Sequence, residues 1–92
     1  MKLETYNPLD DLLQSPQDVA EYLQAAYQDD DPKVFVVALG HVVRKHGVSE
    51  VARRAQLNRE SLYKLFNGKA QPRWDTIQKL LKALNIRIKI AA

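Results

Sequence analysis

The sequence predicts a mainly α-helical protein of five helices that ends in a short β-strand. The first ground is a pair of helix-start signals, Ser15-Pro16 and Asp31-Pro32, in which a capping side chain precedes a proline. The second is the spacing of apolar residues, which recur every three or four positions within five segments. The third is Ile86–Ile90, where apolar and basic residues alternate strictly, as is typical of a strand.

The composition is that of one small folded protein, and it excludes several kinds of site. The chain has 92 residues, of which 46% are hydrophobic and 27% charged, a size that suits a single domain. It contains no cysteine, which excludes a disulfide scaffold, a thiolate zinc site and a cysteine nucleophile. No run of 18 apolar residues and no secretory signal is visible, so we expect a cytoplasmic protein without a membrane partner.

The net charge of +3 conceals an uneven distribution along the chain. Residues 1–40 contain two bases and eight acids, a net charge of −6, whereas residues 41–92 contain twelve bases and three acids, a net charge of +9. Such asymmetry favours a polyanion as the partner of the basic half and a different partner for the acidic half. On charge alone, a solvated surface with chance clustering explains the pattern equally well.

The first helix is predicted to begin at Ser15-Pro16, because Asp18 is placed as the acid of a capping box. Residues 1–14 show no helical period. Asp29–Asp31 is expected to end the helix and to cap the next one. The apolar stripe of the first helix consists of Val19, Tyr22, Leu23, Ala26 and Tyr27.

The segment after Pro32 is ambiguous between strand and helix. Val34–Val37 is rich in β-branched residues and could form a buried strand. The Asp31-Pro32 start and the spacing of the apolar residues favour a helix, and Arg44–His46 would place basic residues in its last turn. We therefore predict a helix that ends at Gly47, a natural left-handed stop. Its inward residues would be Phe35, Leu39, Val42 and Val43.

Three further helices are predicted, over residues 49–55, 59–67 and 74–84. Gly68 is expected to close the second, and Asn85 to be a left-handed cap of the third. Their inward residues would be Val51, Ala52 and Ala55 in the first, Leu62, Leu65 and Phe66 in the second, and Ile77, Leu80, Leu81 and Leu84 in the third, with Trp74 anchoring the last helix to the core. The strand that follows must pair with residues near 2–6, with a second subunit or with a partner protein.

Three residues have the spacing that a helix-turn-helix unit needs. Ala52 is a small residue that lets two helices cross closely, Gln56 stands in the turn, and Leu62 would pin the second helix onto the first. The stretch VARRAQLNRESLYKLFNGKAQPRWDTIQKLLKALNI resembles the lambda-repressor-like helix-turn-helix domains. The shared pattern includes L-x-x-x-x-N-G at Leu62 to Gly68, the proline-containing connector and the helix D-T-I-x-K-L-x-K-A-L.

Two positions depart from the pattern of that family. Gln56 stands where glycine is usual, so it would have to take a positive φ or shift the turn. Arg73 replaces a serine-like helix cap, and as a cation it could instead reach a phosphate.

The whole layout, with two proline-initiated helices before the motif and a β tail after it, resembles the HigA-like antidote proteins of bacterial toxin–antitoxin (addiction) modules. The resemblance covers nearly the full chain. It implies a type II antitoxin that neutralises a RelE/ParE-superfamily toxin, often an mRNA-cleaving one, and represses its own operon. We divide the chain into residues 1–31, an acidic arm and first helix, and residues 32–92, a lambda-repressor-like DNA-binding domain with a C-terminal strand, together forming one compact unit.

The candidate DNA-binding residues follow from placing the helix of residues 59–67 in a major groove. Arg59 could bind guanine and Glu60 could accept a hydrogen bond from a cytosine amine, while connector cations would contact phosphates. Each could also be an ordinary solvated surface residue. The full set is Ser49, Asn58, Arg59, Glu60, Ser61, Tyr63, Lys64, Lys69, Gln71 and Arg73.

No catalytic residue, metal site or cofactor is predicted, so we do not expect an enzyme. His41 and His46 are five positions apart and point to different sides of a helix, which suits surface or helix-capping roles. Asp29–Asp31 lacks the ligand spacing and the glycine of an EF-hand. The serines lack a nucleophile elbow.

The predicted partners are double-stranded DNA, the toxin and a second copy of the chain. Operator geometry leads us to expect a two-fold homodimer. Asp10, Asp11 and Asp29–Asp31 could offer a basic toxin complementary charge. Two alternative functions share these features: a prophage-type or operon repressor without a toxin, and a protein-interaction module that no longer binds DNA.

Overall fold

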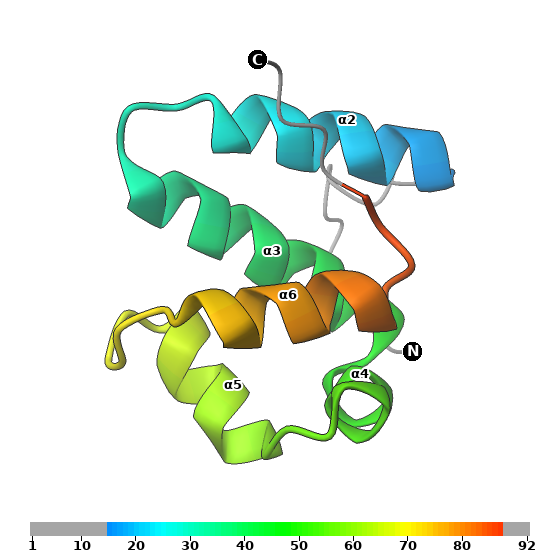
Figure 1. The fold of residues 1–92 in the computed structure, drawn as a ribbon, viewed down its shortest axis with the longest axis vertical. Coiled ribbons are helices and arrows are strands. Elements are labelled where there is room, and N and C mark those ends of the chain that lie inside the picture. Colours follow the sequence, from blue (N-terminus) through cyan, green and yellow to red (C-terminus); the bar gives the residue numbers. More distant parts are fainter. Residues whose placement is uncertain (1–14, 88–92) are drawn as a thin grey trace, which may run out of the picture.

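Five helices make up the computed structural model of this protein, in which residues 15–87 are described (Figure 1). They are α2 (Pro16–Tyr27), α3 (Pro32–His46), α4 (Val48–Ala55), α5 (Arg59–Phe66) and α6 (Trp74–Ala83). No strand occurs between residues 15 and 87. The predicted mainly α fold and its five helices are therefore confirmed. None of these helices is both long and apolar enough to cross a membrane.

The predicted C-terminal strand is not confirmed. Of its residues Ile86–Ile90, the described range includes Ile86 and Arg87, and neither lies in a strand. Residues 88–90 and the suggested partner strand near residues 2–6 lie outside the described residues, as do Asp10 and Asp11.

The two predicted helix starts are confirmed in detail. Ser15 Oγ accepts a hydrogen bond from the backbone N–H of Asp18 at 3.1 Å, and the Ser15 N–H donates to Asp18 Oδ2 at 3.3 Å, which completes a capping box. Asp31 Oδ1 accepts from the N–H of Lys33 at 2.9 Å. Because this cap starts a regular helix at Pro32, the β-branched segment Val34–Val37 is helical and not a strand.

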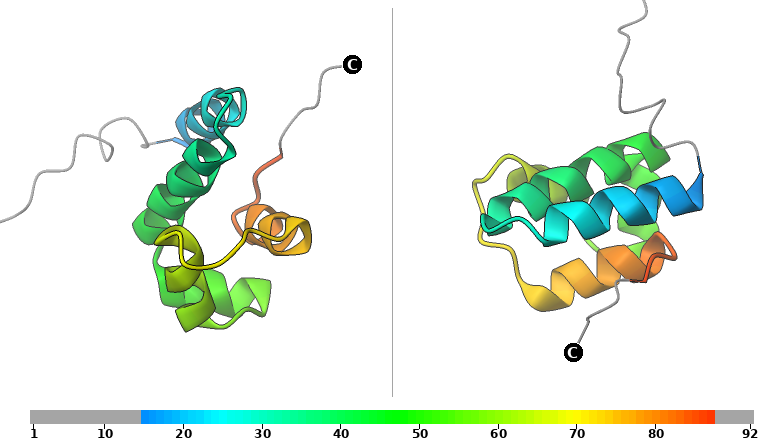
Figure 2. Two further views of the ribbon diagram at one scale, coloured as in Figure 1. Left: turned by 90° about the vertical axis from the view of Figure 1, so that its left-hand side faces the viewer. Right: turned by 90° about the horizontal axis from the view of Figure 1, so that it is seen from above.

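α3 lies at the centre of the fold. It runs antiparallel to α2, and it also packs against α4 and α5, while α6 packs on α4 (Figures 1 and 2). The apolar stripe of each helix therefore faces one shared core. The buried residues of that core are Val19, Leu23, Ala26, Phe35, Ala38, Leu39, Val42, Val43, Val51, Ala52, Ala55, Leu62, Leu65, Phe66, Ile77, Leu80 and Leu81.

Tyr22 and His41 join α2 to α3 through a polar contact inside the interface. The Tyr22 hydroxyl and His41 Nδ1 lie 2.8 Å apart, and the two rings stack with centroids 6.4 Å apart. Partial burial raises the pKa of Tyr22 above its ordinary value of 10.0. His41 is half-buried, which differs from the surface or capping role predicted for it, because it occupies the side of α3 that faces α2.

Trp74 does not anchor α6 to the core, so that prediction was wrong. Its side chain is 58% exposed, whereas Ile77, one turn further along, is buried. The helix begins one turn before its apolar stripe reaches the core, and Trp74 stands in that first turn.

Gly40 allows α5 to approach α3 closely. A Cβ atom built at this position would lie 3.0–3.2 Å from the Cβ, Cγ and Cδ1 atoms of Phe66, which is tighter than ordinary van der Waals contact. Arg44 lies over the same ring, with its guanidinium carbon 5.8 Å from the ring centroid. Phe66 is therefore held between the backbone of α3 and a cation.

We expect Gly40→Ala to lower the free energy of unfolding by about 1 kcal/mol. Overpacking against Phe66 costs about 1–3 kcal/mol, and the better helix propensity of alanine offsets about 1 kcal/mol of that. Urea denaturation of both proteins measures the difference. In a Phe66→Leu background, the alanine should instead be neutral or stabilising. If Gly40→Ala alone stabilises the protein, then the Phe66 ring shifts easily, and the close approach of α5 to α3 does not require glycine at this position.

Candidate nucleic-acid interface

All ten predicted DNA-binding residues are exposed. Ser49 lies in the first turn of α4, and Asn58 is the N-cap of α5. Lys69, Gln71 and Arg73 follow the other end of α5 and lead into α6. The side chains of α5 that face outward are Arg59, Glu60, Ser61, Tyr63 and Lys64.

One hydrogen bond brings the amino ends of α4 and α5 onto a common surface. Arg59 Nη1 donates to Ser49 Oγ at 2.8 Å, across ten positions of sequence. Both groups are exposed, so the guanidinium is held at the surface and not in the core. The contact gives Arg59 a defined direction beside the N-terminus of α5.

The turn between the two helices gives α5 its direction. Gln56 takes the left-handed conformation with φ 57° and ψ 44°, so of the two alternatives predicted for it the positive φ holds. The N–H of Leu57 donates to the carbonyl oxygen of Ala52 at 2.9 Å, which closes the end of α4. Asn58 then caps α5 by accepting from the N–H of Glu60 at 2.7 Å, as predicted. As a result, α5 crosses α4 steeply (Figure 1).

The connector residues stand apart from the Ser49–Arg59 contact. They follow the carboxyl end of α5, where Gly68 has a φ of 76° and Lys69 N–H donates to the carbonyl oxygen of Lys64 at 2.8 Å. Arg73 Nε lies 3.4 Å from Asp75 Oδ1, so its cation is partly compensated in this structure. The candidate phosphate contacts therefore form two groups, Ser49 near one end and the connector residues at the other end of a helix of eight residues, about 12 Å long.

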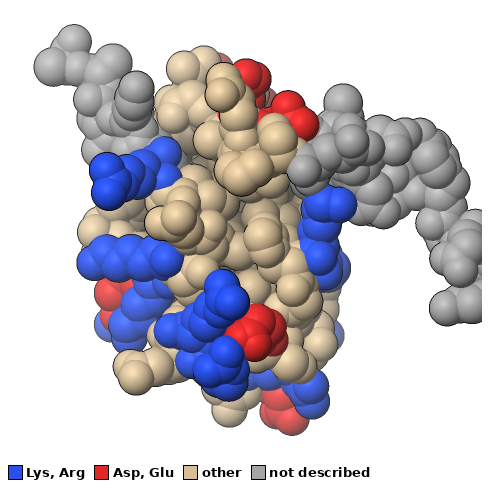
Figure 3. Space-filling view, turned by 90° about the vertical axis from the view of Figure 1, so that its right-hand side faces the viewer, with Lys and Arg blue, Asp and Glu red and all other residues tan. Residues whose placement is uncertain are grey.

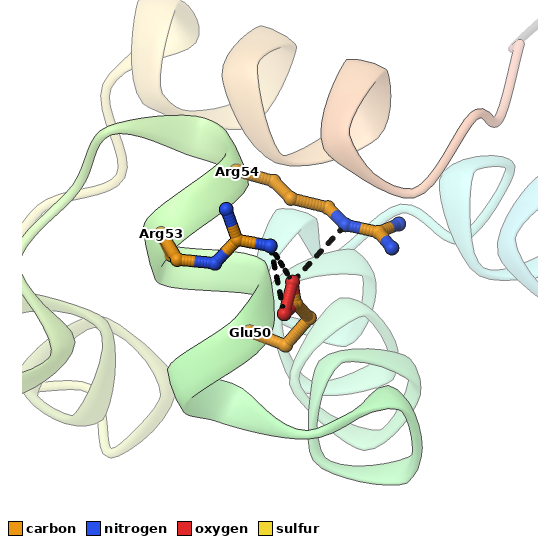
Figure 4. A network of polar contacts seen from close by, with 3 residues as sticks. All are labelled: Glu50, Arg53 and Arg54. Carbon is orange, nitrogen blue, oxygen red and sulfur yellow. Dashed lines mark hydrogen bonds and ion pairs between the residues drawn. The ribbon is translucent and has the colours of Figure 1, made fainter.

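α4 carries a charge network that the sequence prediction missed. Arg53 Nη2 bonds both carboxylate oxygens of Glu50, at 2.9 Å to Oε1, and Arg54 Nε lies 3.4 Å from Oε2 (Figure 4). The spacings of three and four positions along one helix are the sequence signal that could have revealed it. The hydrogen bond from Arg53 and the charges of both arginines hold the pKa of Glu50 below its ordinary value of 4.5.

The charges divide between the two ends of the fold. Ser15–Asp31, which contains α2, carries five acids and no lysine or arginine. Arg44–Arg87 carries eleven bases and three acids. Figure 3 shows acidic side chains at the top edge of one face, where α2 lies, and basic side chains over the rest of that face with fewer acidic side chains among them. Within residues 15–87, no three His, Asp or Glu side chains converge as metal ligands.

Acid should abolish the contribution of Glu50 to stability. Because the folded state lowers its pKa, Glu50 stabilises the fold above pH 4.5, and this contribution is lost as the pH falls through the lowered pKa. We expect the melting temperature of Glu50→Gln, measured by circular dichroism, to lie slightly below that of the wild type at pH 7. At about pH 2 the two melting temperatures should be equal. A difference that persists in acid would mean that Glu50 acts through its shape and not its charge.

Comparison with known proteins places the chain in a family. Residues 2–92 match a family described as "Probable addiction module antidote protein". A protein of Haemophilus influenzae, described as an uncharacterized protein, is 35% identical over 78 residues, which cover 85% of this chain and 80% of that relative. No solved structure matches the chain. The chain thus belongs to the family of probable addiction module antidote proteins.

Proposed function

We propose that this protein is the DNA-binding antitoxin of a type II toxin–antitoxin module, which neutralises a RelE/ParE-superfamily toxin and represses its own operon. Membership of an antidote family supports the neutralising role. The single observation that carries the DNA-binding role is the bond between Arg59 and Ser49, which unites the amino ends of α4 and α5 in one exposed surface.

In this proposal, α4 and α5 form a helix-turn-helix of the lambda-repressor-like, HigA-like kind, and α5 enters a major groove. Its N-terminal turn presents Arg59 and Glu60 to base edges, where a guanidinium can bind guanine O6 and N7 together. The bond to Ser49 leaves the other Arg59 donors available for a base. Ser61, Tyr63 and Lys64 extend the same exposed side of the helix.

Phosphates would be held on both sides of that groove. The amino end of α4 offers Ser49 and backbone N–H groups, and the connector offers Lys69, Gln71 and Arg73. The two groups flank a helix about 12 Å long, and the major groove is about 12 Å wide. Two copies related by a two-fold axis would read two half-sites in the cytoplasm, with residues 32–92 as the DNA-binding domain and residues 1–31 as an acidic arm.

Arg59→Ala tests base recognition. The variant should lose roughly 1–3 kcal/mol of affinity for the DNA upstream of the operon while its binding to a random duplex changes little, because a base contact carries specificity. Gel shifts at constant salt measure both affinities. Arg87→Ala, which removes an exposed arginine beyond α6, is the matched control and should change neither. Equal losses on both duplexes would make Arg59 a phosphate contact.

Lys69→Ala tests whether the connector contacts phosphates. A phosphate contact contributes to every sequence, so affinity for the upstream DNA and for a random duplex should fall together, with their ratio unchanged. The plot of log affinity against log salt should become shallower by about 1 for each lysine removed. Binding that is insensitive to salt in the wild type would refute the docking of this surface on DNA.

A further inference from the structure

An open apolar groove runs between α2 and α3 on the acidic side of the fold. Its volume is about 530 Å³. Small side chains on facing turns of the two helices leave room between larger ones, and Asp31 and Lys33 stand among the lining residues at the start of α3. The apolar lining consists of Tyr22, Ala25, Ala26, Val34, Val37 and Ala38.

Two valines that line this groove are exposed to solvent, although valine side chains are usually buried. Val34 is 37% and Val37 is 47% exposed, and they are two of the five large hydrophobic residues exposed within residues 15–87. They are three positions apart on α3, so they are neighbours on successive turns and form one continuous patch. The patch continues into the apolar lining of the groove, so a partner that fills the groove would bury both valines.

The charges beside the groove favour a basic partner. Asp31 lines it, Asp29 and Asp30 precede it in the loop, and Glu21 stands one turn before Ala25 on α2. The single base in the lining is Lys33. Opposite charge placed around an apolar contact selects and orients a partner.

We propose that this groove binds the toxin partner of the antidote, through a toxin segment that carries apolar side chains between lysines or arginines. The inference rests on the proposed function, because it requires that the chain has a toxin. The apolar side chains of that segment fill the space above Val34 and Val37, and its bases meet Glu21 and Asp29–Asp31.

The same charges disfavour two other occupants. DNA would be repelled by the acids of α2 and the loop. A second copy bound through a two-fold axis would place this surface against itself, so that Asp29–Asp31 of one copy would approach the acids of the other. A basic protein segment meets neither obstacle.

The test uses the full chain and, as the probe, the protein encoded by the reading frame adjacent to its gene, with binding measured by titration calorimetry. Val37→Asp buries an unpaired charge in the contact and should weaken binding at least tenfold, while Val37→Ile should bind like the wild type. Gln78→Asp is the matched control, because it adds the same charge to an exposed position of α6, and it should not weaken binding. The charge reversals Glu21→Lys and Asp30→Lys, combined, should also weaken binding at least tenfold and reduce its salt dependence.

Two companion measurements make the result decisive. Val37→Asp should keep the melting temperature and the molecular mass in solution of the wild type, because the residue is exposed. Unchanged toxin binding by Val37→Asp overturns the assignment of the groove. A changed mass would assign the groove to a second copy, and a large fall in melting temperature would mean that the chain itself covers it; either overturns the proposal. If the wild type does not bind the probe, the toxin-neutralising function itself fails.

Discussion

Burial of one face of α3 is the constraint on which the other helices depend. Six residues of this helix are buried, and α2, α4 and α5 all pack against it. Gly40 brings α5 to van der Waals distance of the α3 backbone, and Leu39, Val42 and Val43 are fully enclosed. Since close-packed side chains resist displacement, the surface of α2 and the surface of α4 and α5 are attached to two sides of one rigid element.

Charge separation follows from this arrangement because the acids and the bases lie on different helices. α2 and the loop after it hold five acids without a base, whereas most of the bases lie in the last turn of α3 and in the segments after it. Had the charges alternated along the chain, each helix would present a mixed face. Within the basic end, Glu50 offsets repulsion between the two arginines of α4, which lets a basic surface form without a run of uncompensated cations.

What the sequence predicted well is local, and what it did not predict depends on tertiary packing. Helix caps at Ser15, Asp31 and Asn58 are set by residues within a few positions, so residue type and spacing were sufficient, whereas the sequence left the conformation of Gln56 open between two alternatives. The exposure of Trp74 and the Tyr22–His41 contact depend on where one helix meets another. Exposure of the candidate residues on α5 followed from helix periodicity, whereas the Ser49–Arg59 bond depends on the angle that the α4–α5 turn imposes.

The proposed groove and the proposed DNA surface are separated at α2 and α5 but adjoin at the connector, because Val37 also lines a pocket with Lys69 and Gln71. α2 is separated from α5 by α3, and two successive helix contacts of about 8–10 Å each place them roughly 16–20 Å apart. This exceeds the screening length of about 8 Å at physiological salt, so the charges of α2 act weakly on α5. Neutralising the acids of α2 would therefore change the affinity of α5 for DNA little by electrostatics alone. Strong coupling between a toxin in the groove and an operator would have to pass through the connector beside Val37, through a displacement of α3 or through a change in how two copies of the chain are arranged on the DNA.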